Sequence, residues 1–404
     1  MIGGSSLKHF NYLTKDREEK IFYRMPIEFS KDSEKELLAL SLGACLYMPG
    51  TRLSICADIV NQKHDGLVSM VLCLEDAVSD NEVYQAELNV IAQLQQLHMQ
   101  LESGAIMIDE LPIIFIRVRS EKQMRYVAEH LGSSIHVLAG FVFPKFTAEN
   151  GQGYIAALRD LNDQYGIRLY GMPILESAEV IYKESRISSL LSIKQLLDEH
   201  FDCILNVRMG ATDFCGLYGI RRSSDSTIYD ISVVRDCIAD IVNVFGRSEK
   251  EYVVSGPVWE YFYREERVLK PQLRQTPFMN SLGKEGLSLR KEFLNEYLDG
   301  LIQEVLLDKN NGLTGKTVIH PTHIKPVHAF SVVSYEEYMD AISILEGIGG
   351  ESGVLKSQFS NKMNEMKPHY NWAIKIVSKA KIYGVYHEQC SYIDLLTEQE
   401  QICI

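Results

Sequence analysis

The stretch MVLCLEDAVSD, residues 70–80, decides which fold the chain is expected to have. It begins as an apolar run typical of a buried strand and ends abruptly in two adjacent carboxylates, Glu75 and Asp76. A solvated loop can carry such a pair by chance. In a parallel α/β sheet, however, polar residues that follow buried strands gather at one edge, where active sites are found. The other strands of the chain therefore decide between the two interpretations.

Short strand-like runs alternate with longer helical patterns along most of the 404 residues. The predicted strands are ACLYM (44–48), SMVLCLE (69–75), IIFIRVR (113–119), GFVFPKF (140–146), RLYGMPIL (168–175), CILNVRM (203–209), EYVVSGP (251–257) and KTVIHP (316–321). Segments between them, such as 81–101 and 189–200, place apolar residues at helical spacing. This alternation predicts an α/β fold of parallel βα units, and eight units complete a (β/α)8 TIM barrel. An open doubly wound sheet is the alternative.

Three parts of the chain fall outside this pattern. Residues 1–40 precede the first strand and have mixed charge, which predicts an N-terminal arm that could pack on a neighbouring subunit. The barrel is expected over 41–350, with 335–348 as its closing helix and a long insertion over 256–284 after the seventh strand. Residues 351–404 are expected to form a C-terminal helical extension.

Composition excludes several classes of protein. The net charge is −13 and no run of lysine and arginine is present, so nucleic acid is not an expected partner. No apolar stretch is long enough to span a bilayer and the first residues lack the apolar core of a signal peptide, so we expect a cytoplasmic protein that does not bind membranes. The eight cysteines form no CxxC pair, which indicates reduced thiols.

Polar residues follow most of the predicted strands and would meet at one rim of a parallel barrel. They are Glu75, Asp76, Arg117, Arg119, Lys145, Glu176, Asp213 and His320. Mg²⁺ prefers oxygen ligands and usually takes one or two protein carboxylates, with water and substrate oxygens completing its shell. We therefore predict Mg²⁺ as the cofactor, with Glu176 and Asp213 as its ligands.

An anionic substrate is expected beside this metal. Arg117 and Arg119 alternate in phase on one strand, so both would point inward, and a guanidinium group can hold a carboxylate through two hydrogen bonds. The segment RMGATDF adds Gly210, Ala211 and Thr212, small residues whose backbone amides could approach a bound anion closely. These five residues are the predicted substrate-binding set.

Several short motifs carry a resemblance to a known family. In chain order they are MPG (48–50), LEDAV (74–78), IRV (116–118), LES (175–177), GATDF (210–214) and GLTGKTVIHPTHI (312–324). Together they resemble the citrate lyase β-subunit-like branch of the HpcH/HpaI aldolase family. The chain is most similar to a divergent branch of TIM-barrel carbon–carbon lyases associated with tellurite-resistance and stress operons.

The resemblance implies a (β/α)8 barrel that uses Mg²⁺ to cleave or form a carbon–carbon bond next to a carbonyl group, commonly on acyl-CoA substrates. By position, Glu176 and Asp213 match the metal ligands and Arg117 matches the arginine that holds the carboxylate of an α-keto acid. Glu75 and Asp76 match the acidic pair that supports the water shell of the metal. With Arg117, they are the predicted catalytic residues.

The chain also departs from the family pattern. Cys73 stands where the family's DLED motif has its first acid, and the arginine expected before the PG turn is missing. Coenzyme A use is therefore an open question. Besides a carbon–carbon lyase, the alternatives are a thioesterase or hydrolase on the same metal site and a non-catalytic partner subunit of a stress-response complex. A homo-oligomer is the default expectation for such an enzyme.

The insertion suggests a further class of substrate. Its aromatic residues Trp259, Tyr261, Phe262 and Tyr263 are followed by the basic residues Arg264, Arg267, Lys270 and Arg274. Such a mixture suits stacking on a ring and binding of phosphate or carboxylate groups, which favours a phosphorylated or nucleotide-like compound. Packing of the same aromatic residues against the barrel is an equally simple interpretation.

Overall fold

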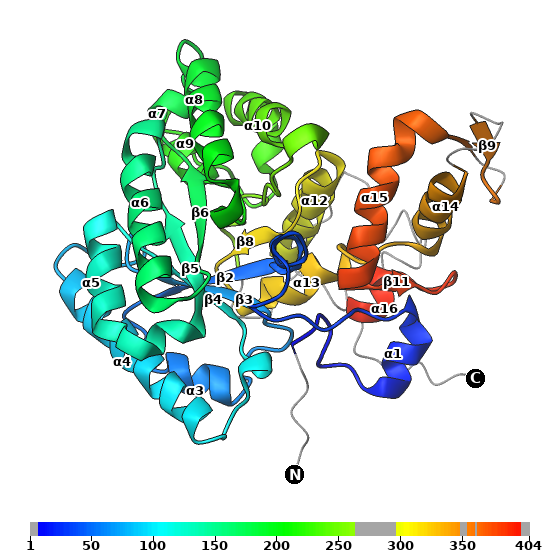
Figure 1. The fold of residues 1–404 in the computed structure, drawn as a ribbon. Coiled ribbons are helices and arrows are strands. Elements are labelled where there is room, and N and C mark those ends of the chain that lie inside the picture. The colour runs from blue at the N-terminus through cyan, green and yellow to red at the C-terminus, as the bar shows by residue number, and fades with distance from the viewer. Residues whose placement is uncertain (1–6, 263–295, 348–353, 360–361, 397–404) are drawn as a thin grey trace.

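A sheet of seven parallel strands curls at the centre of the molecule, inside a layer of helices (Figure 1). This computed structural model describes residues 7–262, 296–347, 354–359 and 362–396. The strand order is β7-β6-β5-β4-β3-β2-β8. The strands are β2 (Ala44–Pro49), β3 (Ser69–Cys73), β4 (Ile113–Arg117), β5 (Leu138–Phe143), β6 (Tyr170–Leu175), β7 (Arg208–Met209) and β8 (Lys316–Val318).

The predicted seventh strand fills the gap between the two edges of this sheet. Val254 forms a parallel bridge to Val207, and Gly256 forms one to Lys316 in β8. The amide of Ser255 donates a hydrogen bond to the carbonyl of Val207 at 3.0 Å. Because these bridges join the β7 edge to the β8 edge, the sheet closes into a barrel. The prediction of a TIM barrel is confirmed, although its seventh strand is made of isolated bridges.

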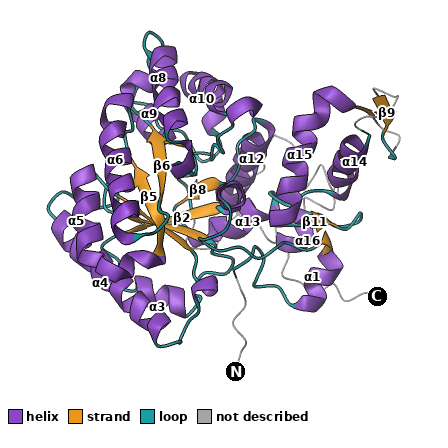
Figure 2. Ribbon diagram, in the orientation of Figure 1, coloured by secondary structure: helices purple, strands orange, loops and turns teal. Residues whose placement is uncertain are grey.

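Helices cover the outer face of the sheet, as the purple ribbons around the orange strands show (Figure 2). Around the barrel they are α3 (Ile55–Val60), α4 (Val83–Glu102), α5 (Glu121–Leu131), α6 (Ala148–Tyr165), α7 (Ala178–Ile181), α8 (Arg186–Glu199), α9 (Ala211–Leu217), α10 (Ser232–Phe245), α12 (Glu296–Asn310) and α13 (Ile324–Ala329). Their apolar faces and the outward residues of the strands form the largest buried cluster. The alternating pattern thus separates an outer core from the barrel interior.

The inward residues of the strands form a second core, and the N-terminal arm closes one end of it. Val71 and Phe115 from the strands share this cluster with Leu38 of α2 (Lys35–Ser41) and with Leu42. The Ser69 hydroxyl donates a hydrogen bond to the carbonyl of Leu42 at 2.5 Å. Ser69 and Ala44 begin their strands, so the arm covers the amino ends of the barrel. The opposite rim is left for the polar residues that follow the strands.

The remainder of the arm packs on the C-terminal part of the same chain. Strand β1 (Phe22–Arg24), which follows α1 (Lys15–Ile21), pairs antiparallel with β11 (Val385–Tyr386). Phe10 and Phe22 are buried with Tyr383 and Tyr386 in one cluster. Much of the arm's apolar surface is thus covered within the chain, although Tyr23 and Met25 are exposed.

Two long helices dominate the C-terminal part, beside the barrel (Figure 1). They are α14 (Tyr335–Glu346) and α15 (Met366–Tyr383), and they share a buried cluster that includes Ile344 and Ile376. The short elements β9 (Val354–Lys356), β10 (Met363–Glu365) and α16 (Tyr392–Leu396) complete this part. The expectation that 335–348 closes the barrel is wrong, because this helix packs on α15. Helix α13 follows β8 and covers the barrel there.

None of the helices in the described part of the chain is long and apolar enough to cross a membrane. The seven described cysteines are all free thiols, as expected from their spacing.

Candidate active site

A cavity of about 330 Å³ lies where the barrel strands end. Residues that end or follow β2, β3, β4, β6, β7 and β8 line it. The lining residues include Tyr47, Cys73, Asp76, Arg117, Glu176, Arg208, Gly210, Thr212, Asp213 and Thr317. The structure therefore brings most of the predicted site residues to one concave place.

The carboxyl groups of Glu176 and Asp213 lie close together in the wall of this cavity. Glu176 follows β6, is almost fully buried, and accepts a hydrogen bond from the amide of Lys145 at 2.8 Å. Burial, together with the negative charge of Asp213, raises the pKa of Glu176 to about 8. Burial and the charge of Asp76 also raise the pKa of Asp213. Two carboxyl groups whose ionised forms are both disfavoured create a place where a cation would be stabilised.

Gly210 makes room for this pair. A side-chain carbon at Gly210 would lie 2.1 Å from Oε2 of Glu176 and 3.0 Å from Oδ2 of Asp213. Both distances are shorter than a van der Waals contact, and both oxygens lie around the same point. The glycine of the RMGATDF segment is therefore required by the approach of two carboxylates, and not only by a turn.

The donor set fits a hard divalent cation. Among the described residues there is no cluster of three or more histidine, cysteine, aspartate or glutamate side chains that could hold a metal. Structural zinc sites need four such ligands, whereas Mg²⁺ needs only one or two carboxylates. Glu176 and Asp213, with the space beside Gly210, therefore suit Mg²⁺ better than a soft metal.

Glu75 and Asp76 form an ion-pair network with Arg117 and Lys145. The Arg117 guanidinium lies 3.3 Å from Glu75 and 3.6 Å from Asp76. Nζ of Lys145 lies 2.5 Å from Glu75 and 3.3 Å from Asp76. Burial raises the pKa of Glu75, whereas hydrogen bonding to Glu75 and the nearby cations lower that of Asp76. Asp76 lines the cavity and Glu75 lies behind it, so the two acids have different surroundings.

Lys145 connects this network to Glu176. Its backbone has φ +48°, a left-handed conformation that is costly for a residue with a side chain. In that conformation its amide binds Glu176 while its ammonium group binds Glu75. Lys145 therefore connects Glu176, a predicted metal ligand, to Glu75 of the acidic pair after β3.

Cys73 occupies the position that, by the resemblance to the citrate lyase β-subunit-like branch, was expected to hold an acid. The strand register places it directly beside Arg117. Its Sγ accepts hydrogen bonds from Nη2 and Nε of Arg117, at 3.0 and 3.2 Å. The Cys73 side chain therefore helps to hold the guanidinium group in place.

Two other predicted substrate-binding residues lie outside the cavity wall. The Arg119 guanidinium binds the carbonyls of Leu74 and Val78 and forms an ion pair with Asp80 at 2.5 Å. Strand β4 ends at Arg117, so the alternation that predicted an inward Arg119 stops before it. Ala211 is buried in the outer core. Neither Arg119 nor the side chain of Ala211 lines the cavity, whereas Thr212 does and binds Glu260 at 3.1 Å.

Sequence reasoning missed Arg208, Tyr47 and Thr317, all of which line the cavity. Arg208 is the only charged residue of the predicted strand CILNVRM. A charged residue near the carboxyl end of a buried strand is the signal that could have identified it.

The start of the insertion packs on the barrel. The Trp259 ring is fully buried and lies against the Arg222 guanidinium, 4.8 Å from it. It cannot stack on a ligand in this position. Phe262 is partly exposed and stacks on His320, with ring centroids 4.7 Å apart. Tyr263, Arg264, Arg267, Lys270 and Arg274 lie outside the described residues.

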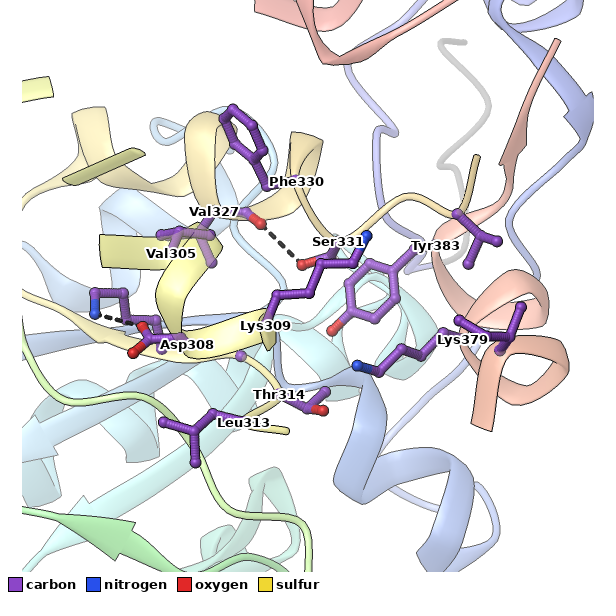
Figure 3. A pocket seen from close by; sticks show the side chains of 14 residues that line it. Val305, Asp308, Lys309, Leu313, Thr314, Val327, Phe330, Ser331, Lys379 and Tyr383 are labelled. Carbon is purple, nitrogen blue, oxygen red and sulfur yellow. Dashed lines mark hydrogen bonds and ion pairs between the residues drawn. The ribbon is translucent and has the colours of Figure 1, made fainter. Parts of the chain in front are cut away.

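A second, much smaller cavity of about 30 Å³ lies between the barrel and α15 (Figure 3). Lys309 from α12, and Lys379 and Tyr383 from α15, are among the side chains around it. Burial and the charge of Lys309 lower the pKa of Lys379 to about 8. This cavity shares no lining residue with the larger one and has room for little more than a water molecule.

Comparison with known proteins agrees with this architecture. A citrate lyase from Burkholderia xenovorans LB400 aligns with 88% of the chain and 96% of its own length, with a TM-score of 0.57 at 14% identity. The CitE protein from Mycobacterium tuberculosis, solved with magnesium, acetoacetate and coenzyme A, aligns with 85% of the chain and 99% of its own, with a TM-score of 0.50 at 15% identity. No curated protein sequence matches the chain significantly.

Residues 36–385 match the family described as carbon–carbon bond lyases of the TIM-barrel fold. This range includes every strand of the barrel and all the residues of the candidate active site. The chain therefore belongs to the TIM-barrel carbon–carbon bond lyases.

Proposed function

We propose that this carbon–carbon lyase depends on Mg²⁺ and cleaves or forms a bond in a small substrate that carries a carboxylate, either an α-keto acid or an acyl-CoA-type compound. The single observation that carries the proposal is the approach of Glu176 and Asp213 around the space left by Gly210. The structurally similar CitE protein was solved with magnesium and acetoacetate, which supports the same chemistry at this rim.

Bound Mg²⁺ would stabilise the negative charge that develops on the oxygen of a substrate carbonyl group. Residues of the chain would hold the cation and shape the site around it. Glu176 and Asp213 would hold the cation, and the fixed position of Glu176 is secured by the Lys145 amide. Ile174 and Met209 form an apolar part of the cavity wall.

Arg117 is the candidate for binding the substrate carboxylate. Cys73 and Glu75 hold its guanidinium in one orientation, so little freedom is lost when a ligand binds. Asp76 lines the cavity and is the member of the acidic pair placed to accept a hydrogen bond from a bound group. Glu75 instead positions Arg117 and Lys145.

The test is Mg²⁺ titration by calorimetry of the wild type, Glu176→Gln and Asp213→Asn. Loss of an outer partner of a metal commonly weakens binding 10- to 100-fold, so loss of a ligand should weaken it by about 100-fold or more. Glu179→Gln is the matched control, because Glu179 is exposed three residues away. Equal Mg²⁺ affinity in all four proteins would overturn the proposed metal site.

Turnover is then measured on a panel of α-keto acids and acyl-CoA compounds, with and without Mg²⁺. New carbonyl products in the presence of Mg²⁺, absent in Glu176→Gln, are the expected result. Release of free coenzyme A with no cleavage of a carbon–carbon bond would indicate a thioesterase instead.

A further inference from the structure

Arg208 is a buried arginine that has no acidic partner in the part of the chain that the structure describes. Its side chain lines the active-site cavity and is 1% exposed. Its Nη2 donates a hydrogen bond to Oγ1 of Thr317 at 2.7 Å, while Nε and Nη1 have no acceptor among the described residues. No described carboxylate lies within ion-pair distance of it.

The other buried arginines of the described chain are paired. Arg186 lies 2.9 Å from Asp240, and Arg222 forms ion pairs with Glu260 and Glu304. Removing a guanidinium group from water without a counter-ion costs several kcal/mol, so proteins rarely keep such a group without a reason. Arg208 therefore carries a positive charge that no described residue balances at ion-pair distance.

A count of the charges in the site shows that Arg208 lacks a counter-charge among the described residues. Arg117 and Lys145 are in contact with Glu75 and Asp76, so these four charges cancel. When both are ionised, the predicted metal ligands Glu176 and Asp213 carry two negative charges, which equal the charge of one divalent cation. With that cation bound, the charge of Arg208 would still be unmatched.

The hydroxyl group of Tyr47 adds a second unused donor beside Arg208. It is buried without a hydrogen-bond partner, although Tyr47 lines the cavity. The guanidinium carbons of Arg117 and Arg208 lie 5.5 and 5.6 Å from the centroid of the Tyr47 ring. Both arginines also line the same cavity, so one small molecule bound there can contact both.

We propose that Arg208, with Thr317 and Tyr47, binds a second anionic group of the substrate. This inference rests on the proposed function, in which Arg117 holds the first carboxylate. The substrate class becomes an α-keto acid with a further carboxylate or phosphoryl group, and the cavity of about 330 Å³ has room for a molecule of that size. Arg208 is thus assigned as a residue that determines substrate specificity.

The test compares three probes by calorimetry, with Mg²⁺ and with a chelator. Pyruvate has one anionic group, 2-oxoglutarate adds a carboxylate and phosphonopyruvate adds a phosphonate. The wild type should bind at least one of the latter two about tenfold more tightly than pyruvate, as expected when a charged hydrogen bond is gained. The better of the two identifies the second group.

Arg208→Gln should remove this preference and leave the affinity for pyruvate within about twofold. Arg186→Gln is the control variant and should keep the preference, because Arg186 is buried away from the cavity. Thr317→Val, which removes the neighbouring hydroxyl, should reduce the preference in part. The unliganded Arg208→Gln protein should melt no lower than the wild type, because an unmatched buried charge is gone. A purely structural arginine would instead give a lower melting temperature and unchanged preference.

The two proposals fail in different ways. Binding that requires Mg²⁺ but shows no preference for a second anionic group overturns the role of Arg208 and leaves the metal site intact. A preference for a two-anion probe that persists in chelator and is lost in Arg208→Gln supports the proposed role of Arg208 and counts against the proposed Mg²⁺ site. Absence of binding by both two-anion probes overturns the role of Arg208.

Discussion

Gly210 has no side chain at the point where Glu176 and Asp213 approach each other. Replacement by alanine would place a carbon 2.1 Å from the Glu176 carboxylate and 2.6 Å from its Cβ, so Glu176 must move by about an ångström or more. We expect Gly210→Ala to fold and to bind Mg²⁺ at least about tenfold more weakly, since sites lose affinity when a ligand is displaced by this amount. Calorimetric Mg²⁺ titration measures the change.

Gly216→Ala is the matched control for that substitution. Gly216 lies in α9, the helix that begins directly after Gly210, and a side-chain carbon at Gly216 would contact nothing within 4 Å. Alanine should therefore leave Mg²⁺ affinity unchanged and the melting temperature equal or slightly higher. If Gly210→Ala binds Mg²⁺ as the wild type does, the space beside Gly210 is not part of a metal site.

For individual residues, the sequence predicted some side chains of the cavity and not others. Asp213 and Arg117 could be placed because each lies at or just after the end of an apolar run. Arg119 was misplaced because alternation along a strand holds only as far as the strand does. Arg208 was missed because whether an arginine has a partner depends on residues that are distant in sequence.

Among the elements, β8 is anchored by a buried ion network. Nζ of Lys316 lies 2.9 Å from Glu304 and 2.7 Å from Asp308, both on α12, and all three residues are almost fully buried. Tyr229 also donates a hydrogen bond to Asp308 at 2.7 Å. The lysine of the GLTGKTVIHPTHI segment thus ties the barrel strand to its helix.

Lys316→Met should be strongly destabilising, because it leaves Asp308 without its cation and Glu304 with only Arg222. Loss of one partner from a buried pair typically costs about 3–5 kcal/mol in the free energy of unfolding. Arg125→Met is the comparison: Arg125 lies 2.6 Å from Asp160, but both are exposed, so its loss should cost about 1 kcal/mol or less. Chemical denaturation measures both. Equal losses for the two variants would contradict the assignment of a buried network.

The elements themselves were largely predictable, since apolar runs and helical spacing depend on local sequence. The exceptions have long-range causes. The strand at 251–257 pairs only by single bridges, and the close approach of Gly256 to Asp308 fixes its path. Helix α14 has the spacing of a barrel helix, yet its apolar face packs on α15. Local pattern shows which face of a helix is buried, but not which element covers it.

Across the whole molecule, buried histidines make stability depend on pH. Nε2 of His328 accepts a hydrogen bond from the Ala44 amide at 3.0 Å, and Nε2 of His323 lies 3.0 Å from the Tyr261 carbonyl. Burial lowers the pKa of His328 to about 3 and, with the charge of His320, lowers that of His323 to about 4. The unfolded chain therefore binds these protons first, and stability falls as the pH falls below about 6.5.

Between pH 7 and pH 5 each of these histidines should lower the free energy of unfolding by up to about 2 kcal/mol. Glu176 acts in the opposite sense, because its raised pKa contributes stability that is lost as the pH rises from about 4.5 toward 8. The measurement is therefore a comparison of variants by denaturation at both pH values. His323→Gln should reduce the loss at pH 5, whereas replacement of the exposed His136 by glutamine should not. An unchanged loss in His323→Gln would refute the assignment.

The pairing of β1 with β11 also affects the order in which parts of the chain can fold during synthesis. Nε2 of His387 lies 3.2 Å from the carbonyl of Glu19, across a separation of 368 residues. At about 5–20 residues per second, the ribosome needs on the order of tens of seconds to bridge that gap. Throughout this interval Phe10 and Phe22 lack Tyr383 and Tyr386, with which they are buried in the folded chain, while the strands of the barrel emerge in order and can already pair. The arm can therefore complete its docking only after residues 383–387 have been made, later than the pairing of the barrel strands.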